Sequence, residues 1–248
     1  MELPLDIIRF EIAKRLELFD VARLGMVCRL YSKLWRLWIT ELTYSDVVHM
    51  KGKRLSQFSN LEVLNVSGYV PVRKIHKLKR LKSLTIFLNN NSRYTFLSGL
   101  HTLSLRHSLI SDVSMLGAIR ILDLAFTNIT DVSALGGVHT LNISYTDVTD
   151  VSMLGRVYNL DISHTKVKDV SALGGINTIN LSWTYVSDVS MLGGVYNLDL
   201  SYTSVRDVSA LGGVYILNLR GTRISDISPV CNVPELTLPE LDLIPMYT

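Results

Sequence analysis

Residues 131–149 read DVSALGGVHTLNISYTDVT, and the chain continues with DVSMLGRVYNLDISHTKVK over 150–168 and DVSALGGINTINLSWTYVS over 169–187. The three segments are variants of one nineteen-residue unit that opens with an aspartate. That aspartate recurs in register at Asp112, Asp131, Asp150, Asp169, Asp188, Asp207 and Asp226. A fixed period of this size is the signature of a solenoid, in which each repeat forms one turn of a coil. We therefore expect a stack of nearly identical turns.

Each unit contains two apolar residues separated by one position, an alternation that is typical of a β-strand with one buried face. The pairs are Leu64/Val66, Leu84/Ile86, Leu103/Leu105, Leu122/Leu124, Leu141/Ile143, Leu160/Ile162, Ile179/Leu181, Leu198/Leu200, Leu217/Leu219 and Leu236/Leu238. They predict about ten turns, with an irregular eleventh near Leu42.

The rest of each unit is expected to form the bends of the coil. A threonine such as Thr146 follows the strand and is expected to bond the backbone of neighbouring turns. In D-V-S-x-L-G, aspartate and serine two positions apart are typical of an Asx turn that opens a short helical turn. The glycine is expected to permit the sharp reversal into the next strand. Nineteen residues leave no room for a full helix of about eleven residues, so the side opposite the strands should be extended or 3₁₀-helical.

The unit resembles a leucine-rich repeat. The core pattern L-x-x-L-x-L-x-x-(N/C/T) is matched by VHTLNISYT at Val138–Thr146, and SDISPV at Ser225–Val230 is close to the short "DI-x-PL" form. The resemblance covers roughly residues 55 to 240, and the style is similar to repeat proteins of large DNA viruses of amoebae. It implies an α/β solenoid with a parallel sheet on the concave side and extended or 3₁₀ segments on the convex side.

Side chains between and after the strand leucines should point outward and form columns along the coil. Between the leucines, aspartate and asparagine alternate, and this spacing avoids roughly 1 kcal/mol of repulsion between adjacent carboxylates. The next outward column is expected to be Ser144, Ser163, Ser182 and Ser201. A row of rings lies beside it, and such exposed rings commonly mark contact surfaces. The predicted substrate-binding residues are Asp123, Phe126, Tyr145, Asp161, His164, Trp183, Asp199 and Tyr202. The alternative is that the rings only stack on one another and shield the sheet edge.

Residues 3–34 differ in kind, because apolar residues recur there at helical spacing and Asp20 is placed to cap a second helix. This pattern predicts a helical hairpin or a three-helix unit. The segment resembles an F-box, L-P-x-(D/E)-(I/L)-(I/L) followed by D-(L/V)-x-x-L-x-x-V-C-R, with Tyr31 where tryptophan is usual. The resemblance implies adaptor-binding residues Leu3, Pro4, Ile8, Ile12, Leu16, Val21, Leu24, Val27, Cys28 and Leu34. The alternative is a helical cap on the first turn of the solenoid.

These patterns predict an F-box at 1–42, irregular repeats at 43–102, regular repeats at 103–230 and a C-terminal cap at 231–248. The resemblance implies the substrate-recognition subunit of an SCF-type cullin-RING ubiquitin ligase. Its F-box would bind an SKP-type adaptor, and the concave face of its repeats would bind a target protein of basic character. The alternative is a non-catalytic scaffold that binds a protein or a carbohydrate and whose N-terminal helices are only a cap.

Composition limits the other classes of function. No nucleophilic triad, phosphate loop or cluster of metal ligands is recognisable, so we expect no enzyme activity, catalytic residue, cofactor or metal. The basic segment VRKIHKLKRLK lacks interleaved aromatic residues, which disfavours nucleic acid as a partner. The start of the chain lacks the apolar core of a signal peptide, and Cys28 and Cys231 lie far apart. We therefore expect a soluble cytoplasmic or nuclear protein without a membrane partner, in the host cell if viral, and monomeric outside its complex.

Overall fold

The computed structural model describes residues 40–42, 58–66, 75–88, 97 and 99–238 of the 248-residue chain. The chain forms two compact units, Met1–Phe87 and Leu88–Thr248. The predicted helical hairpin and all ten predicted adaptor-binding residues lie outside the described residues.

Among its described residues, the first unit contains three short parallel strands. They are β1 (Glu41–Leu42), β2 (Val63–Val66) and β3 (Ser83–Ile86), and a 3₁₀ segment, η3 (Ile75–Lys77), precedes β3. β1 pairs with β2, and β2 pairs with β3. The predicted leucines occupy equivalent positions in the three strands and are fully buried. The irregular first turn expected near Leu42 is therefore present as a strand.

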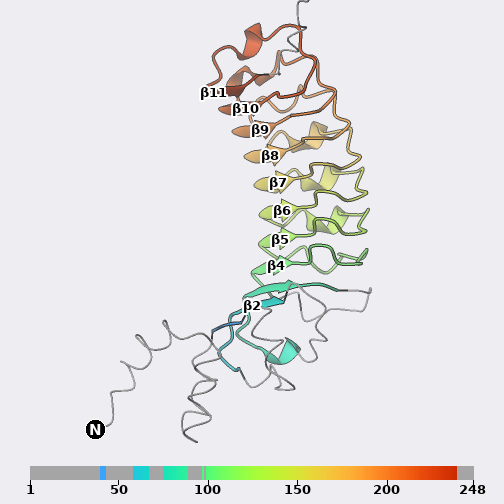
Figure 1. The fold of residues 1–248 in the computed structure, drawn as a ribbon, viewed down its shortest axis with the longest axis vertical. Helices are drawn as coiled ribbons and strands as arrows, with labels where there is room; N and C mark the ends of the chain where they lie inside the picture. Colours follow the sequence, from blue (N-terminus) through green and yellow to red (C-terminus); the bar gives the residue numbers. More distant parts are fainter. Residues whose placement is uncertain (1–39, 43–57, 67–74, 89–96, 98, 239–248) are drawn as a thin grey trace, which may run out of the picture. The chain divides into compact units, whose positions relative to one another are not determined.

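The second unit is a regular coil in which each turn contributes one three-residue strand. The strands are β4 (Thr102–Ser104), β5 (Ile121–Asp123), β6 (Thr140–Asn142), β7 (Asn159–Asp161), β8 (Thr178–Asn180), β9 (Asn197–Asp199), β10 (Ile216–Asn218) and β11 (Glu235–Thr237). Each strand pairs in parallel with the next, so that Leu141 lies beside Leu160, for example. Figure 1 shows these strands stacked in chain order. The predicted strands and their register are confirmed.

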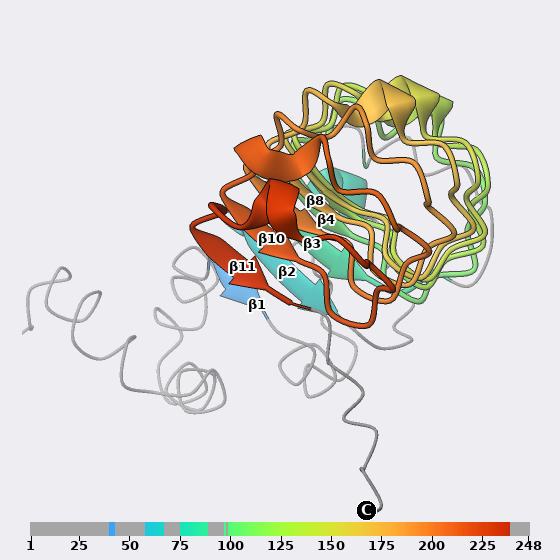
Figure 2. The same ribbon diagram turned by 90° about the horizontal axis from the view of Figure 1, so that it is seen from above.

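Short 3₁₀ segments interrupt the return path of most turns. They are η5 (Ser133–Leu135), η6 (Ser152–Leu154), η7 (Ser171–Leu173), η8 (Leu211–Gly213) and η9 (Ser228–Val230). Seen along the stack in Figure 2, the strands line one wall of the coil and η5–η7 lie on another. The predicted solenoid with a parallel sheet and 3₁₀ turns is confirmed for this unit.

Each D-V-S or D-I-S motif forms an Asx turn, as predicted, and in four of the seven copies a 3₁₀ segment begins at its serine. In all seven copies the serine N–H donates to the aspartate Oδ1 at 2.9 to 3.0 Å. This backbone hydrogen bond lowers the pKa of Asp131, Asp150, Asp169, Asp188 and Asp207 below the usual value, and the serine hydroxyl adds to the effect.

The core is a file of apolar side chains that repeats in every turn. In the turn that begins with β6, the inward residues are at most 2% exposed. They are Leu141, Ile143, Val148, Val151, Leu154 and Val157. Full burial of such a side chain contributes about 1.5 to 3 kcal/mol before the entropy of ordering is subtracted. The stack is therefore stabilised mainly by contacts between equivalent residues of successive turns.

Three expectations about the bends are wrong in detail. The threonines do not bond neighbouring turns: each Oγ1 donates to the carbonyl three residues earlier in its own turn, at 2.6 to 2.7 Å. The serines expected to point outward are buried. The glycine after the 3₁₀ segment has an ordinary right-handed conformation, with φ of −61° at Gly174. Its role is close approach, because a Cβ there would lie 2.5 Å from the carbonyl oxygen of Met191 in the next turn.

Candidate binding surface

The third residue after the end of each strand from β4 to β9 has an unusual backbone. Among the described residues, six non-glycine residues have positive φ, between 55° and 61°, and all six carry a ring. They are His107, Phe126, Tyr145, His164, Trp183 and Tyr202, which we call the ring column. This left-handed region normally favours glycine, asparagine and aspartate, and bulky residues rarely occupy it. The fold must therefore stabilise this conformation.

Hydrogen bonds between turns stabilise it. The N–H of each ring residue donates to a carbonyl of the next turn at 2.8 to 3.0 Å; Tyr145, for example, bonds to Ser163. From Phe126 to Tyr202, the buried threonine that follows closes the bend with its own hydroxyl, as Thr146 does toward Ile143. Because the hydrogen bond to the next turn recurs at all six rings, the left-handed residue is held at the same place in each turn.

The rings stack on one another without interruption. Centroid distances along the column are 4.5, 4.2, 4.0, 5.4 and 4.4 Å from His107 to Tyr202, with interplanar angles of 10° to 25°. Such offset stacking contributes about 0.5 to 1.5 kcal/mol per pair beyond burial. Gly221 takes the next position, with φ of 67°, and a Cβ there would lie 2.5 Å from the ring of Tyr202. The last ring therefore packs directly against the backbone of Gly221.

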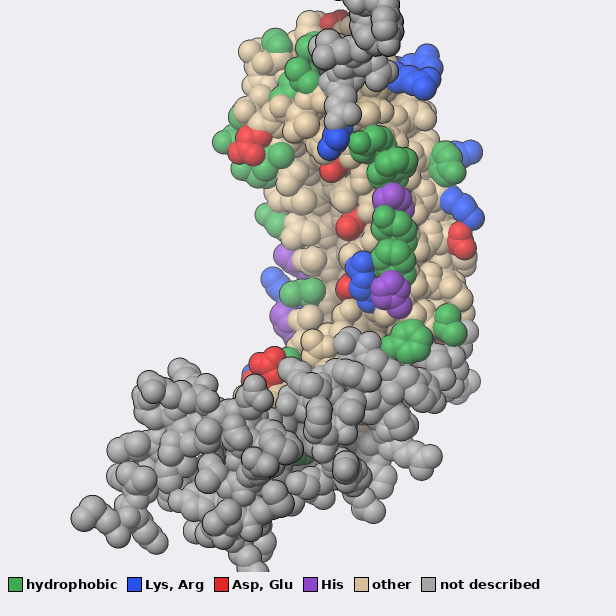
Figure 3. All heavy atoms as spheres, in the orientation of Figure 1, with side chains coloured by type: hydrophobic (Ala, Val, Ile, Leu, Met, Phe, Trp, Pro, Cys, Tyr) green, Lys and Arg blue, Asp and Glu red, His purple; other side chains and the backbone are tan. Residues whose placement is uncertain are grey.

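The column remains accessible although its rings cover one another's faces. Tyr145 is 46% exposed, Trp183 52% and Tyr202 37%. Figure 3 shows a column of hydrophobic and histidine side chains running along the coil. The stacking expected under the alternative reading is thus present, and the rings still offer their edges to solvent.

A groove runs along one side of the ring column. Its floor is formed by Thr127, Thr146 and Thr165, and its second wall by Asn128, Asp147, Lys166 and Tyr185. It spans four turns and has a volume of about 540 Å³. Lys166 Nζ lies 2.7 Å from Asp147 Oδ1, and this hydrogen bond raises the pKa of Lys166. The charges of Lys166 and Asp147 cancel, so the groove is lined by apolar rings and polar side chains without a net charge from this pair.

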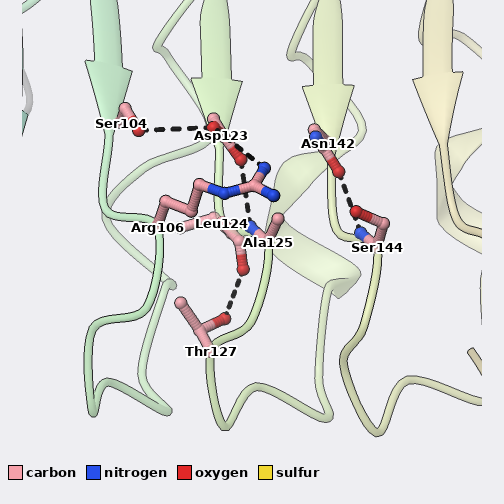
Figure 4. A network of polar contacts seen from close by, with 8 residues as sticks. All are labelled: Ser104, Arg106, Asp123, Leu124, Ala125, Thr127, Asn142 and Ser144. Carbon is pink, nitrogen blue, oxygen red and sulfur yellow. Dashed lines mark hydrogen bonds and ion pairs between the residues drawn. The ribbon is translucent and has the colours of Figure 1, made fainter. Parts of the chain in front are cut away.

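The aspartate and asparagine residues within the strands lie on the other side of the ring column. In each turn the side-chain oxygen accepts the N–H two residues later at 2.8 to 3.1 Å, as Asn142 does from Ser144 in Figure 4. Asparagine and aspartate can both supply this acceptor. The alternation of the two therefore leaves the turn unchanged while it halves the number of carboxylates.

The three carboxylates of this column are not equivalent. Asp123 Oδ2 accepts Ser104 Oγ at 3.3 Å and lies 3.9 Å from Arg106. Asp199 Oδ2 accepts Asn218 Nδ2 at 3.1 Å. Within the described part of the chain, no partner is found for Oδ2 of Asp161. Two of the three predicted acidic contacts are thus already used within the molecule.

The structure brings all eight predicted substrate-binding residues onto adjacent columns of one coil. Sequence reasoning missed His107, although it lies nineteen residues before Phe126, and it missed the groove residues beside the rings. It also missed a second column at the residue before each strand. There His139 stacks on Tyr158 at 5.0 Å, and Tyr196 stacks on Tyr215 at 4.9 Å. The nineteen-residue register would have shown both columns.

The described residues contain no cluster of three histidine, cysteine, aspartate or glutamate side chains placed to hold a metal ion. They also include no helix with the length and apolar character to span a bilayer. His164 is stacked between Tyr145 and Trp183, and His107 is stacked on Phe126 at the end of the ring column, so the two histidines are not grouped as ligands.

Comparison with known proteins establishes the fold. No protein-family model and no curated protein matches the sequence. The structure is similar to that of an internalin (InlF) from Listeria monocytogenes, with a TM-score of 0.65 and 20% identity over 83% of this chain and 68% of that one. A leucine-rich-repeat protein of Leptospira interrogans gives a TM-score of 0.60 and 20% identity over 82% and 59%. TLR13 in its complex with ssRNA13 gives 0.56 and 18% over 82% and 39%.

At these identities the likeness shows the fold alone. The chain folds as a leucine-rich-repeat solenoid, as the repeat pattern indicated. It spans little more than two thirds of the internalin chain and less of the other two.

Proposed function

We propose that this chain is a non-catalytic binding scaffold that recognises a partner protein through the ring column and the adjoining groove. The observation that carries this proposal is the row of half-exposed rings held in a left-handed conformation through six successive turns. Rings at protein interfaces supply large contact area at a low entropic cost. Exposed polar side chains would be sufficient to keep this surface soluble, so the half-exposed rings favour a role in binding.

The covering of the ring faces favours a protein over a carbohydrate. A sugar or a nucleobase binds an aromatic side chain by stacking on its face. Here the faces of the four inner rings are occupied by neighbouring rings at 4.0 to 5.4 Å. The exposed edges and polar tips suit the mixed apolar and polar contacts of a protein surface.

The test uses variants that remove rings without disturbing the backbone. Asparagine tolerates the left-handed region, so Tyr145→Asn/Trp183→Asn should fold and lose the partner. Tyr158→Asn/Tyr196→Asn removes two exposed tyrosines from the other column and is the matched control. Proximity labelling in the native cell should identify proteins that depend on the first pair of rings and not on the second. Equal labelling by both variants would contradict the proposal.

A more specific role rests on the N-terminal sequence. The match of Leu3, Pro4 and Asp20 with their surrounding residues to the F-box pattern supports recruitment of the scaffold's target to an SCF-type ubiquitin ligase. In this second proposal the N-terminal segment binds an SKP-type adaptor, and the repeats hold the target.

A pull-down separates this role from that of a plain cap. The purified full chain should retain the SKP-type adaptor, and Pro4→Ala/Ile8→Asp/Leu24→Asp should lose it. The variant must keep the circular dichroism spectrum of the parent. If neither chain retains the adaptor while both stay folded, the hairpin is a cap and the scaffold acts without the ligase.

A further inference from the structure

Arg106 shows how a guanidinium group is held on this surface. Its Cζ lies 4.7 Å from the centroid of the Phe126 ring, and its Nη1 lies 3.9 Å from Oδ2 of Asp123. Both contacts are with the next turn of the coil, toward which Arg106 reaches in Figure 4. Because the faces of Phe126 are stacked on His107 and Tyr145, the guanidinium packs beside the ring column while it pairs with the carboxylate. Its planar fork fits a carboxylate better than a lysine ammonium does.

The same pair of groups recurs two turns later without an arginine. Asp161 and His164 hold the positions of Asp123 and Phe126, and Ser144 holds the position of Arg106. Ser144 is buried, and its short side chain cannot extend over the next turn as Arg106 does. The site that the chain fills with its own arginine at Asp123 is therefore left open at Asp161.

The hydrogen bonding of Asp161 fits an open site. Its Oδ1 accepts the N–H of Ser163 at 3.0 Å, and, as noted above, no partner for its Oδ2 is found among the described residues. The neighbouring turns carry the uncharged Asn142 and Asn180 at the same position. A half-buried carboxylate with one free oxygen favours a charged donor, because a charge-assisted hydrogen bond is stronger than a neutral one.

We propose that the partner places an arginine side chain against Asp161 and the rings of Tyr145 and His164, in the manner of Arg106. This inference rests on the proposed scaffold function and names the chemistry that the partner must present. A second, weaker position lies two turns further at Asp199, where Ser182 takes the place of the arginine and Asn218 shares the carboxylate. Two turns span about 9.6 Å, and three residues of a polyproline-II segment cover about 9.3 Å with side chains i and i+3 on the same face. The partner segment therefore takes this conformation and carries arginines three residues apart.

The first test is a titration with the peptide acetyl-Arg-Gly-Ser-Arg-amide, followed by the amide resonances of the ¹⁵N-labelled full chain. The Ser163 N–H, which donates to Asp161, should shift and saturate. The same peptide with citrulline in place of arginine should leave it unmoved, because citrulline keeps the shape and loses the charge. Asp161→Asn should bind the arginine peptide at least tenfold more weakly.

Two reciprocal variants test the assignment: Ser144→Arg should fill the site at Asp161, and Arg106→Ser should expose the equivalent site at Asp123. Ser144→Arg supplies the arginine in cis and should also weaken binding at least tenfold; Arg106 and Arg220 show that this column accommodates arginine. Arg106→Ser should open a new site at Asp123, reported by the amide of Ala125. Melting temperatures close to that of the parent would establish that both variants are folded.

Equal binding of the citrulline peptide, or unchanged affinity in Asp161→Asn, would overturn the proposal. So would a labelled partner that Tyr145→Asn/Trp183→Asn loses and Ser144→Arg keeps. That last result would leave the scaffold function standing, so the two failures are distinguishable. Loss of the partner in both variants, together with arginine-dependent shifts at Ser163, is the expected result.

Discussion

The ring column and the glycines of the return path are both places where successive turns of the coil come close together. At the first glycine of each turn, such as Gly174, backbone meets backbone, and even a methyl group would collide with a carbonyl oxygen. At the ring column there is room for a side chain, and flat rings fill it by stacking. The first glycine position therefore allows one residue type, whereas the ring positions allow phenylalanine, tyrosine, histidine, tryptophan and, at Gly221, no side chain at all. Because the ring positions accept several kinds of side chain, their residues can be selected for binding a partner.

The largest expected effect comes from adding a methyl group where backbones touch. Gly174→Ala should lower the free energy of unfolding by about 2 kcal/mol, because its Cβ would lie 2.5 Å from the oxygen of Met191 and the turn must shift. Gly175→Ala is the matched control, since the nearest atom to its Cβ is 3.5 Å away. That variant should change stability by about 0.5 kcal/mol or less. Urea denaturation of both would measure the difference, and equal losses would refute the close-approach argument.

A smaller loss is expected at the floor of the groove. Thr165→Val keeps the shape of the side chain and removes the hydrogen bond from Oγ1 to the carbonyl of Ile162. The expected cost is about 1 kcal/mol, because that buried carbonyl loses one donor. Thr165→Ser retains the donor and is the control. If the valine variant is as stable as the parent, the threonine does not fix the bend beneath the rings.

A still smaller change is expected at the ring column itself. Tyr145→Asn loses stacking on Phe126 and His164 and relieves the cost of a bulky residue with φ of 57°. The two effects oppose each other, and the net change in unfolding free energy should stay within about 1 kcal/mol. Thermal denaturation followed by circular dichroism would measure it. If Tyr145→Asn lowered the unfolding free energy as much as Gly174→Ala, the rings would be as important for stability as the glycines, and the contrast between the two regions would not hold.

The smallest effect concerns the exposed Asx turns. The serine amide holds the pKa of Asp169 below its usual value, so the ionised carboxylate stabilises the folded chain above the unfolded pKa of about 3.9. This stabilisation is lost as the pH falls through the lowered folded pKa. Asp169→Asn keeps an acceptor oxygen and does not titrate, so its melting temperature should match the parent at pH 7 and fall slightly less on acidification. A steeper fall in the variant would contradict the assignment.

The nineteen-residue period was sufficient to predict the strands, their register, the Asx turns and the 3₁₀ segments, because each depends on residues within one repeat. The ring column was found for the same reason. Its left-handed backbone could not be predicted, since rings are poor candidates for that region and the stabilising hydrogen bond comes from another turn. Ser144 was expected to point outward because strand alternation was extended past Asn142, where the chain already bends. The inequality of the three aspartates depends on Arg106 and Asn218 in neighbouring turns, which the pattern of a single repeat does not contain.

The packing of Tyr202 against Gly221 has a consequence for how this surface can evolve. Every turn makes the same hydrogen bonds to the next turn, so a duplication of two turns inserted before Gly221 would lengthen the stack without a new kind of core. Each such event would add about 10 Å of surface and one further carboxylate with its ring. The number of partner arginines that the protein can bind would then depend on the number of repeats alone. Recombination between repeats could raise or lower the affinity for the partner by one pair of turns at a time.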